Sequence, residues 1–344
     1  MISYILKEPK CVEAQEGPKP VPQGREVLVR IRYVGICGSD IHLFNGTYNG
    51  PHSYPMRFGH EWSGVVEAVG SEVTRVAVGD VVTGDCSRYC GACPSCEVDK
   101  NLCQHIEKFG ITVDGASADY ILRDEMYLYK APEGLDIKHL CLSEPVAVAA
   151  HLLEKVRKAV PSGFADKRVL VLGGGVIGMS ALMLLLHMEN CRQAELYDLA
   201  ESRTALARGE GARIPAAQEL ASSSEGGDYA SLYAAAKYDV VIETTGVASV
   251  FANALNLVKP GGVLGCVGMI AKVEIAQKLI VTKSLTVIGS IGGTGDFPRA
   301  MEFLCKNPAS ADKLISHYYP IGEAAQAFAT ARVPEGTMKV VLTL

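Results

Sequence analysis

The chain has no excess of basic residues. It contains 33 lysines and arginines against 38 aspartates and glutamates, for a formal net charge of -5. Proteins that bind nucleic acid present a basic surface, so this balance argues against such a partner. An apolar signal core is also missing from the first ten residues, MISYILKEPK, and we therefore expect a cytoplasmic protein whose eleven cysteines are reduced.

Long apolar runs are scarce as well. The one run with the length of a membrane helix is Val169–Met188 (VLVLGGGVIGMSALMLLLHM), which has no formal charge. Three consecutive glycines near its start favour another interpretation, in which a buried strand leads through a glycine turn into a buried helix. We therefore expect no membrane partner.

At 344 residues the chain is long enough for two domains. Up to about Glu144, short strand-like runs are separated by glycine and proline, as in an irregular antiparallel β domain. Beyond it, apolar strands alternate with helical stretches, which predicts a doubly wound parallel sheet and an α/β fold. The expected strands are Val169–Leu172, Ala194–Tyr197, Val240–Glu243, Val263–Val267 and Leu285–Ile288.

The last segment, Pro298–Leu344, has a helical pattern and a closing strand, KVVLTL, that we expect to return to the first domain. The predicted domains are therefore residues 1–147 with 298–344, and residues 148–297. The polar stretch Ser222–Asp228 is predicted to be a surface loop.

Four cysteines have the spacing C-x2-C-x2-C-x6-C, namely Cys90, Cys93, Cys96 and Cys103. Four thiolates within fourteen residues are typical of a tetrahedral zinc site, here in a lobe of about residues 86–105. A closed shell of four thiolates leaves no position for substrate, so we predict a structural zinc. A zinc-finger binding module would need basic surroundings, whereas Glu97, Asp99 and Glu107 are acidic.

The run VLVLGGGVIG has the G-x-G-x-x-G spacing of a dinucleotide-binding turn, which follows a strand and opens a helix. Asp198 lies twenty residues beyond the last glycine, after the next strand, where a carboxylate binds the ribose hydroxyls of NAD and repels the 2′-phosphate of NADP. Arg203 instead favours NADP, because an arginine at this place accepts a 2′-phosphate. The residues assigned to NAD are Gly173, Gly175, Val176, Ile177, Gly178, Asp198 and Arg203.

Three further segments carry metal-ligand side chains: CGSDIH at 37–42, GHEWSG at 59–64, and Ser143-Glu144-Pro145. Together with the cysteine lobe, GGGVIG and Asp198, they appear in the order found in the zinc-dependent medium-chain alcohol and polyol dehydrogenases. The chain resembles this family over nearly its whole length, in the branch of sorbitol, threonine, galactitol-phosphate and aminocyclitol dehydrogenases. The resemblance implies a GroES-like catalytic domain beside a Rossmann domain, and two zinc ions per chain.

Carried over by motif, the resemblance implies that Cys37 and His60 bind a catalytic zinc. Glu61 and Glu144 are both candidates for the remaining ligand. If His60 and Glu61 lay on a regular strand, their side chains would point in opposite directions, so the choice stays open. Asp40 resembles the carboxylate that orients the histidine ligand.

The catalytic residues implied are Ser39, which accepts the proton of the substrate hydroxyl, His42, which relays it, and Glu61. The expected substrate is a secondary alcohol of a polyol, cyclitol, aminocyclitol or sugar alcohol, with threonine-type amino alcohols as the alternative. A protein that senses NAD without turnover is a further alternative, disfavoured because the relay residues are present.

Trp62 is expected in the core, and no arginine cluster indicates a phosphate pocket. The resemblance also implies a homodimer or homotetramer.

Overall fold

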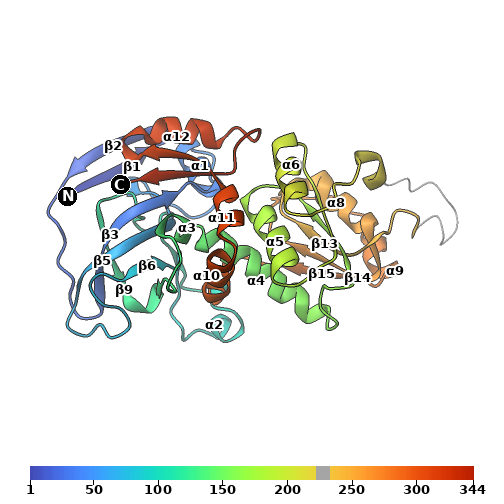
Figure 1. The fold of residues 1–344 in the computed structure, drawn as a ribbon, viewed down its shortest axis with the longest axis horizontal. Coiled ribbons are helices and arrows are strands. Elements are labelled where there is room, and N and C mark those ends of the chain that lie inside the picture. The colour runs from blue at the N-terminus through green and yellow to red at the C-terminus, as the bar shows by residue number, and fades with distance from the viewer. Residues whose placement is uncertain (222–232) are drawn as a thin grey trace. The chain divides into compact units, whose positions relative to one another are not determined.

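The computed structural model describes residues 1–221 and 233–344, which form two compact units (Figure 1). The first unit consists of Met1–Ala147 and Gly292–Leu344, and the second of Val148–Ile291. The chain returns to the first unit between Ile291 and Gly292, slightly before the expected boundary at residues 297 and 298. The expected loop Ser222–Asp228 lies outside the described residues.

The first unit is built mainly of antiparallel strands. Its strands are β1 (Ile2–Glu8), β2 (Cys11–Glu16), β3 (Glu26–Gly35), β4 (Met56–Arg57), β5 (Glu61–Val69), β6 (Val81–Gly84), β7 (Ser87–Arg88), β8 (Glu107–Lys108), β9 (Tyr120–Asp124), β10 (Leu128–Lys130), β16 (Ile315–Pro320) and β17 (Lys339–Thr343). Its helices are α1 (Gly38–Asn45), α2 (Pro94–Val98), α3 (Ile137–Leu140), α10 (Phe297–Lys306), α11 (Pro308–Leu314) and α12 (Ala324–Ala331). Helix α4 (Ser143–Ala159) begins in this unit and continues into the second.

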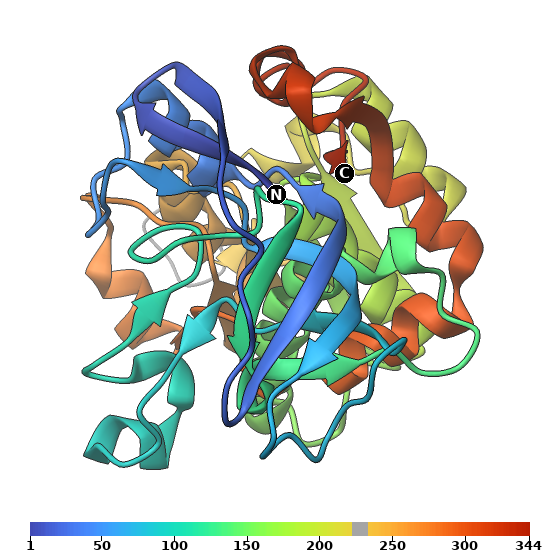
Figure 2. The ribbon, with the colours of Figure 1, turned by 90° about the vertical axis from the view of Figure 1, so that its left-hand side faces the viewer.

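Strand β3 is the centre of the large sheet, whose order is β10-β6-β5-β3-β17-β16, with β9 also paired to β3. Its sequence, EVLVRIRYVG, buries most of its apolar side chains, as expected for an inner strand. The last strand, β17, pairs antiparallel with β3 so that Val341 lies opposite Gly35. The C-terminal segment therefore completes a sheet begun near the N-terminus (Figure 2).

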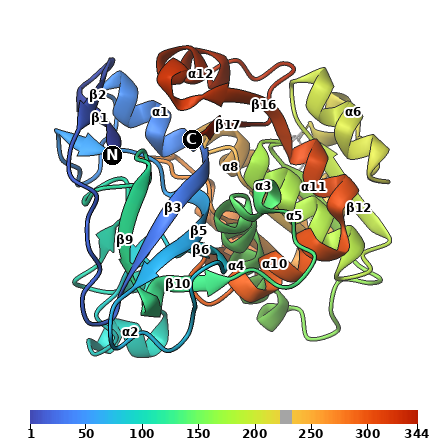
Figure 3. The same cartoon turned by 60° about the vertical axis from the view of Figure 1, so that its left-hand side comes forward.

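Aromatic side chains fix the helix that carries the CGSDIH segment. Figure 3 shows this helix, α1, together with α12. Phe44 of α1 stacks on Phe328 of α12 with ring centroids 4.4 Å apart, and Phe58 packs against the same ring at 5.3 Å. Trp62, the single tryptophan, is completely buried in this core, as the sequence predicts. The ring of Phe328 thereby joins α1 to the segment that leads into His60 and Glu61.

The second unit is a parallel sheet covered by helices. Its elements are β11 (Arg168–Leu172), α5 (Val176–His187), β12 (Gln193–Tyr197), α6 (Glu201–Gly209), β13 (Tyr238–Glu243), α8 (Ala248–Leu257), β14 (Val258–Cys266), α9 (Gln277–Thr282) and β15 (Thr286–Gly289). The strand order is β12-β11-β13-β14-β15. Strand β12 lies on one side of β11, and β13, β14 and β15 follow on the other side, which is a doubly wound topology. Within the described ranges, no helix combines the length and the hydropathy required to span a membrane.

Candidate active site and metal centres

The first cluster of ligand side chains joins the start of α1 to the start of β5. Suitable ligand atoms of Cys37, His60 and Glu61 all lie within 4.8 Å of one another. His60 and Glu61 can converge because β5 begins only at Glu61, and His60 follows Gly59, whose φ is +85°. The backbone therefore turns just before the strand, and the opposite orientation expected of consecutive strand residues does not apply.

Asp40 holds the histidine side of this cluster. One of its oxygens accepts the backbone N–H of Cys37 at 2.9 Å, and the other accepts that of Gly59 at 3.2 Å and lies 3.6 Å from His60 Nδ1. Burial alone would lower the pKa of His60, but the charges of Asp40 and Cys37 raise it well above its ordinary value. Asp40, which is itself fully buried, therefore lies beside the imidazole, and its orienting role stays a prediction.

Lys339 holds the glutamate side. Its Nζ atom donates to Glu61 Oε1 at 2.8 Å and lies 2.5 Å from Oε2, and it also donates to the carbonyl of Ile36 at 3.0 Å. Burial works to lower the pKa of Lys339, but the charges of Glu61 and Cys37 raise it above its ordinary value. The Glu61 carboxylate is thus held by Lys339 beside Cys37 and His60.

Glu144 faces another partner. It begins the first turn of α4, is buried, and accepts a hydrogen bond from the thiol of Cys86 at 3.2 Å. Burial is the main cause that raises the pKa of Glu144 above its ordinary value, and the negative charge of Glu61 adds to it. Glu144 therefore lies close enough to the cluster to interact electrostatically, but the set of mutually close ligand atoms contains Glu61 and not Glu144.

The donors of this cluster fit zinc. A thiolate, an imidazole and a carboxylate are the three kinds of ligand that zinc takes in proteins, and three protein ligands are the number found in open catalytic sites. His60 Nδ1 is buried and has no hydrogen-bond partner within 3.5 Å, although Asp40 lies just beyond that distance. The residues present are thus those that would hold a metal with a free position for substrate.

Ser39 and His42 lie on one side of α1, three residues apart. Ser39 Oγ is 3.4 Å from His60 Nε2, so the hydroxyl lies at the edge of the cluster. The side chain of His42 is exposed and its Nδ1 is 3.0 Å from the hydroxyl of Thr47. The helix therefore presents one hydroxyl at the cluster and one imidazole toward solvent.

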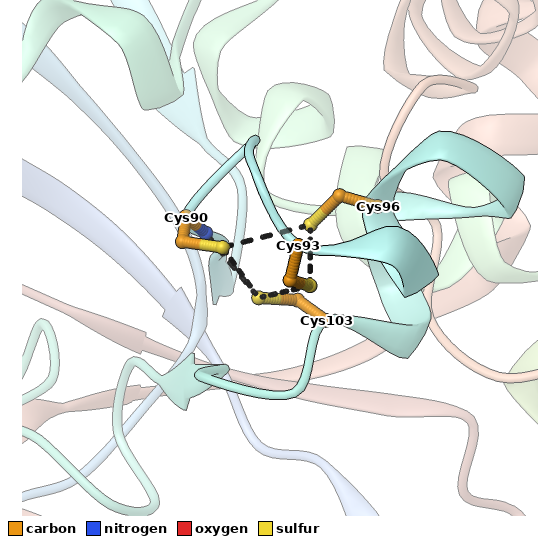
Figure 4. Close-up of side chains that lie close together, drawn as sticks. All are labelled: Cys90, Cys93, Cys96 and Cys103. Carbon is orange, nitrogen blue, oxygen red and sulfur yellow. Dashed lines mark hydrogen bonds between the residues drawn. The ribbon is translucent and has the colours of Figure 1, made fainter.

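The four lobe cysteines surround a second centre (Figure 4). Their Sγ–Sγ distances are 3.5 Å for Cys93–Cys96, 3.6 Å for Cys90–Cys103, and 4.0 Å for both Cys90–Cys96 and Cys93–Cys103. A zinc ion with four sulfur ligands at about 2.3 Å would separate them by about 3.8 Å. None of the four forms a disulfide. The geometry fits a closed tetrathiolate site.

Backbone N–H groups are aimed at these sulfurs. Cys103 Sγ accepts from Cys90 and His105 at 3.3 Å each, and Cys93 Sγ accepts from Gln104 at 3.5 Å. The hydrogen bond from Gln104 is the largest influence that lowers the pKa of Cys93, to about 6. Cys93 is thus favoured as the thiolate that a metal requires, whereas burial raises the pKa of Cys96 to about 12.

The glycine turn of the second unit lies at the carboxyl end of β11. Gly173 has a φ of +98°, and a Cβ on Gly178 would lie 1.9 Å from the Gly173 carbonyl oxygen, so both positions require glycine. A Cβ on Gly175 would meet no protein atom within 4 Å. Packing within the protein therefore does not require glycine at position 175. The close approach of a pyrophosphate to the N-terminus of α5 would require it. Val176 and Ile177, which open that helix, are half-buried.

Asp198 follows β12 immediately and borders the same turn. Its carboxylate accepts the backbone N–H groups of Gly174 at 2.6 Å and Ala200 at 2.8 Å. Arg203 Nη1 lies 3.5 Å from Asp198 Oδ2. The acid and the arginine that favour different cofactors therefore form one ion pair beside the turn.

Three residues were not identifiable from motifs: Lys339, which pairs with Glu61, Cys86, which donates to Glu144, and Lys108, which donates to Ser87 beside Cys86. Lys339 opens an otherwise apolar closing strand, and a lysine in such a run was an available sign of a buried ion pair. Cys86 directly precedes β7 and Lys108 ends β8, and neither belongs to a recognisable motif.

Two protein families match the chain. The alcohol dehydrogenase GroES-like domain matches residues 23–133, and the glucose dehydrogenase C-terminus matches residues 137–344. Among similar proteins, the sorbitol dehydrogenase of Halalkalibacterium halodurans is 30% identical over 96% of this chain and 94% of that protein. The D-arabitol-phosphate dehydrogenase of Enterococcus avium is 30% identical over 94% and 91%. The L-threonine 3-dehydrogenase of Saccharopolyspora erythraea is 29% identical over 93% and 92%.

Solved structures are similar over the full length. An alcohol dehydrogenase of Escherichia coli CFT073, complexed with NADH, aligns with a TM-score of 0.89 at 26% identity, covering 100% of this chain and 99% of that one. A zinc-binding dehydrogenase of Sinorhizobium meliloti 1021, bound to NADP, aligns with a TM-score of 0.85 at 29% identity and the same coverage.

Proposed function

Because the chain belongs to the zinc-dependent medium-chain alcohol and polyol dehydrogenase family, we propose that it transfers a hydride between NAD and a secondary alcohol of a polyol, cyclitol, aminocyclitol or sugar alcohol. The alcohol loses a hydride from carbon and a proton from oxygen, and a ketone, NADH and a proton result. The family determines the class of reaction, and the residues around Cys37 support the proposed zinc binding and proton transfer.

One observation carries the proposal: Cys37, His60 and Glu61 bring ligand atoms within 4.8 Å of one another, and Ser39 Oγ lies 3.4 Å from the imidazole. These three ligands would hold one zinc, and the four lobe cysteines a second. When bound at the first site, zinc supplies a Lewis acid that lowers the pKa of an alcohol hydroxyl. A hydroxyl group at the edge of this cluster is positioned to receive that proton.

The protein residues then remove the proton. Ser39 accepts it from the substrate hydroxyl, and His42, on the same side of α1 and exposed, passes it to solvent. Asp40 keeps His60 oriented, and Lys339 holds the Glu61 carboxylate in place beside the other ligands. The expected roles of Ser39 and His42 remain part of this proposal.

The second unit binds the dinucleotide through the turn between Gly173 and Gly178. Asp198 supports NAD over NADP, because its carboxylate would repel a 2′-phosphate. The two solved relatives carry NADH and NADP respectively, so the choice rests on Asp198 and its ion pair with Arg203. A homodimer or homotetramer stays a prediction.

A threonine-type amino alcohol is the second candidate substrate, and the similarity to the threonine dehydrogenase favours it. A sensor that binds zinc and NAD without turnover is disfavoured, because Cys37, Ser39 and His60 are assembled as one cluster.

The test is a screen of NAD and NADP reduction by the zinc-loaded protein with polyols, inositols, aminocyclitols, sugar-alcohol phosphates and threonine. We expect turnover with NAD and a secondary alcohol of the polyol or cyclitol group. The matched control is Cys37→Ala, which should retain the lobe zinc and lose turnover. Preferential oxidation of threonine would establish the alternative, and failure of every alcohol with both cofactors would refute the enzyme.

A further inference from the structure

We propose that the preferred alcohol carries an anionic group, a carboxylate or a phosphate, and that Lys108 binds this group. The inference rests on the proposed function and narrows its substrate class. Lys108 ends the short strand β8, which pairs with β7 so that Lys108 lies opposite Ser87. Its side chain is half-buried, and no motif in the sequence marks it.

A series of polar contacts connects Lys108 to the metal cluster. Lys108 Nζ donates to Ser87 Oγ at 2.7 Å, and Ser87 Oγ lies 3.9 Å from the sulfur of the neighbouring Cys86. Cys86 donates to Glu144 Oε1 at 3.2 Å, and Glu144 is close enough to His60 and Glu61 for their charges to influence it. Few contacts therefore separate the ammonium group from the proposed zinc ligands.

A second segment approaches the cluster beside Lys108. The electrostatic surroundings of the Tyr48 phenol include His60, Lys108 and Cys37. The loop that carries Tyr48 contacts the turn after Lys108, because Ser53 donates from its backbone to the Ile111 carbonyl at 3.4 Å and from its hydroxyl to the Thr112 carbonyl at 3.5 Å. Lys108 and Tyr48 thus lie on two touching segments, and the Tyr48 phenol lies within electrostatic range of His60, Cys37 and Lys108.

The bonding of Lys108 differs from that of the two buried lysines. Lys339 is neutralised by Glu61, and Lys283 donates to the three carbonyls of Leu255, Asn256 and Val258. Lys108 donates to one neutral hydroxyl, and no carboxylate among residues 1–221 and 233–344 forms an ion pair with it. An ammonium group has three N–H donors, and a half-buried cation beside a substrate site is stabilised by an anion that reaches it.

The two sources of the anion, a sugar acid and a phosphorylated polyol, share the chemistry that Lys108 recognises. The experiment uses sorbitol as the neutral alcohol, gluconate as the carboxylate and sorbitol 6-phosphate as the phosphate. Initial rates with NAD are measured for the zinc-loaded wild type and for Lys108→Met and Lys108→Arg. Lys19→Met is the control, since Lys19 contacts Glu67 and the ring of Tyr120 elsewhere in the unit.

We expect the wild type to have a lower KM for gluconate or for sorbitol 6-phosphate than for sorbitol. Lys108→Met should raise that KM by about 10- to 100-fold, the range expected for losing a hydrogen bond to a charged group. It should leave kcat and the KM for sorbitol nearly unchanged, Lys108→Arg should restore most of the affinity, and Lys19→Met should have no effect. Whichever anionic alcohol shows the effect identifies the source.

Binding of the same three alcohols to the zinc-loaded complex with NADH, followed by isothermal titration calorimetry, gives a readout independent of turnover. A preference of the wild type for sorbitol, or equal effects of Lys108→Met on neutral and anionic alcohols, would overturn the inference and leave the dehydrogenase intact. Failure of every alcohol to reduce NAD would instead refute the proposed function, and this inference with it.

Discussion

The ammonium group of Lys339 lies 2.8 Å from Oε1 and 2.5 Å from Oε2 of Glu61, although 278 residues separate them in the chain. Both side chains are almost completely buried. The contact joins the first residue of the closing strand β17 to the first residue of β5, and so links the C-terminal segment to the proposed zinc site. An ion pair buried this deeply constrains both the fold and the ligand set.

Lys339→Met is therefore expected to lower the free energy of unfolding of the first unit by about 3–5 kcal/mol, because it leaves the Glu61 carboxylate buried without a counter-charge. Trp62 is the only tryptophan and is buried in β5, so its fluorescence in urea reports on this unit. Lys130→Met is the control, since Lys130 pairs with Asp80 at an exposed position and should matter little. Equal urea midpoints for the two variants would contradict the argument.

A second long-range contact suggests what the cysteine lobe holds in place. Asn101, in the short 3-10 helix Lys100–Leu102, accepts the backbone N–H of Thr294 at 3.0 Å and donates to the Thr294 carbonyl at 3.3 Å. Thr294 follows the point at which the chain re-enters the first unit. The lobe is thereby bonded to the returning segment.

Cys93→Ser is expected to remove one zinc and to speed amide hydrogen exchange both in the lobe and at residues 292–296, because the Asn101 contacts depend on the folded lobe. Asn101→Ala should speed exchange at residues 292–296 while retaining both zinc ions. Glu97→Ala, an exposed change on α2, is the control. Mass spectrometry of exchange, with zinc content measured in parallel, tests this, and unchanged exchange at 292–296 in Asn101→Ala would refute it.

The strands and motifs that were predicted correctly are those whose pattern lies within a few neighbouring residues of the sequence. The expected strand Val169–Leu172 is observed as Arg168–Leu172, and Ala194–Tyr197 as Gln193–Tyr197, because apolar runs and glycine turns are local signals. The four cysteines likewise belong to one short segment. Tertiary contacts between distant segments leave no such local pattern.

The metal cluster shows this limit most clearly. The family motifs indicated Cys37 and His60, but the choice between Glu61 and Glu144 depended on where β5 begins and on the thiol of Cys86. Lys339 reaches the cluster from a strand that carries no motif. The position of the second unit boundary also depends on packing, since Thr294, just after the boundary, bonds to Asn101.

Ser39→Ala is expected to retain zinc and NAD binding and to lower kcat by about 10²- to 10⁴-fold, the usual contribution of a positioned proton acceptor. The change removes one hydroxyl at the edge of the cluster and leaves the ligands in place. Steady-state kinetics with zinc analysis test it, and Ser71→Ala, in an exposed turn, is the control. A turnover number close to that of the wild type would remove Ser39 from the relay.

Asp198→Asn is expected to reduce the preference for NAD and to increase activity with NADP. The amide keeps an acceptor oxygen for only one of the two backbone N–H groups, of Gly174 and Ala200, and loses the charge that repels a 2′-phosphate. It also releases Arg203 from its ion pair, so that the guanidinium group is available to the phosphate. The ratio of kcat/KM for the two cofactors measures the effect, and adding Arg203→Ala should abolish the gain with NADP. An unchanged ratio in Asp198→Asn would show that another group selects the cofactor.

Glu61→Gln and Glu144→Gln distinguish the two candidate ligands, because each replacement keeps the size of the side chain and removes its charge. Glu61 is within ligand distance of Cys37 and His60, so Glu61→Gln should weaken binding of the catalytic zinc and leave the lobe zinc in place. Glu144 faces Cys86, so Glu144→Gln should retain both ions. Competition with a chelator of graded strength gives the zinc affinities, with Cys37→Ala as the reference for a lost ligand. If Glu144→Gln releases zinc as readily as Glu61→Gln, both carboxylates take part in holding the ion, and the ligand set is larger than the cluster Cys37–His60–Glu61.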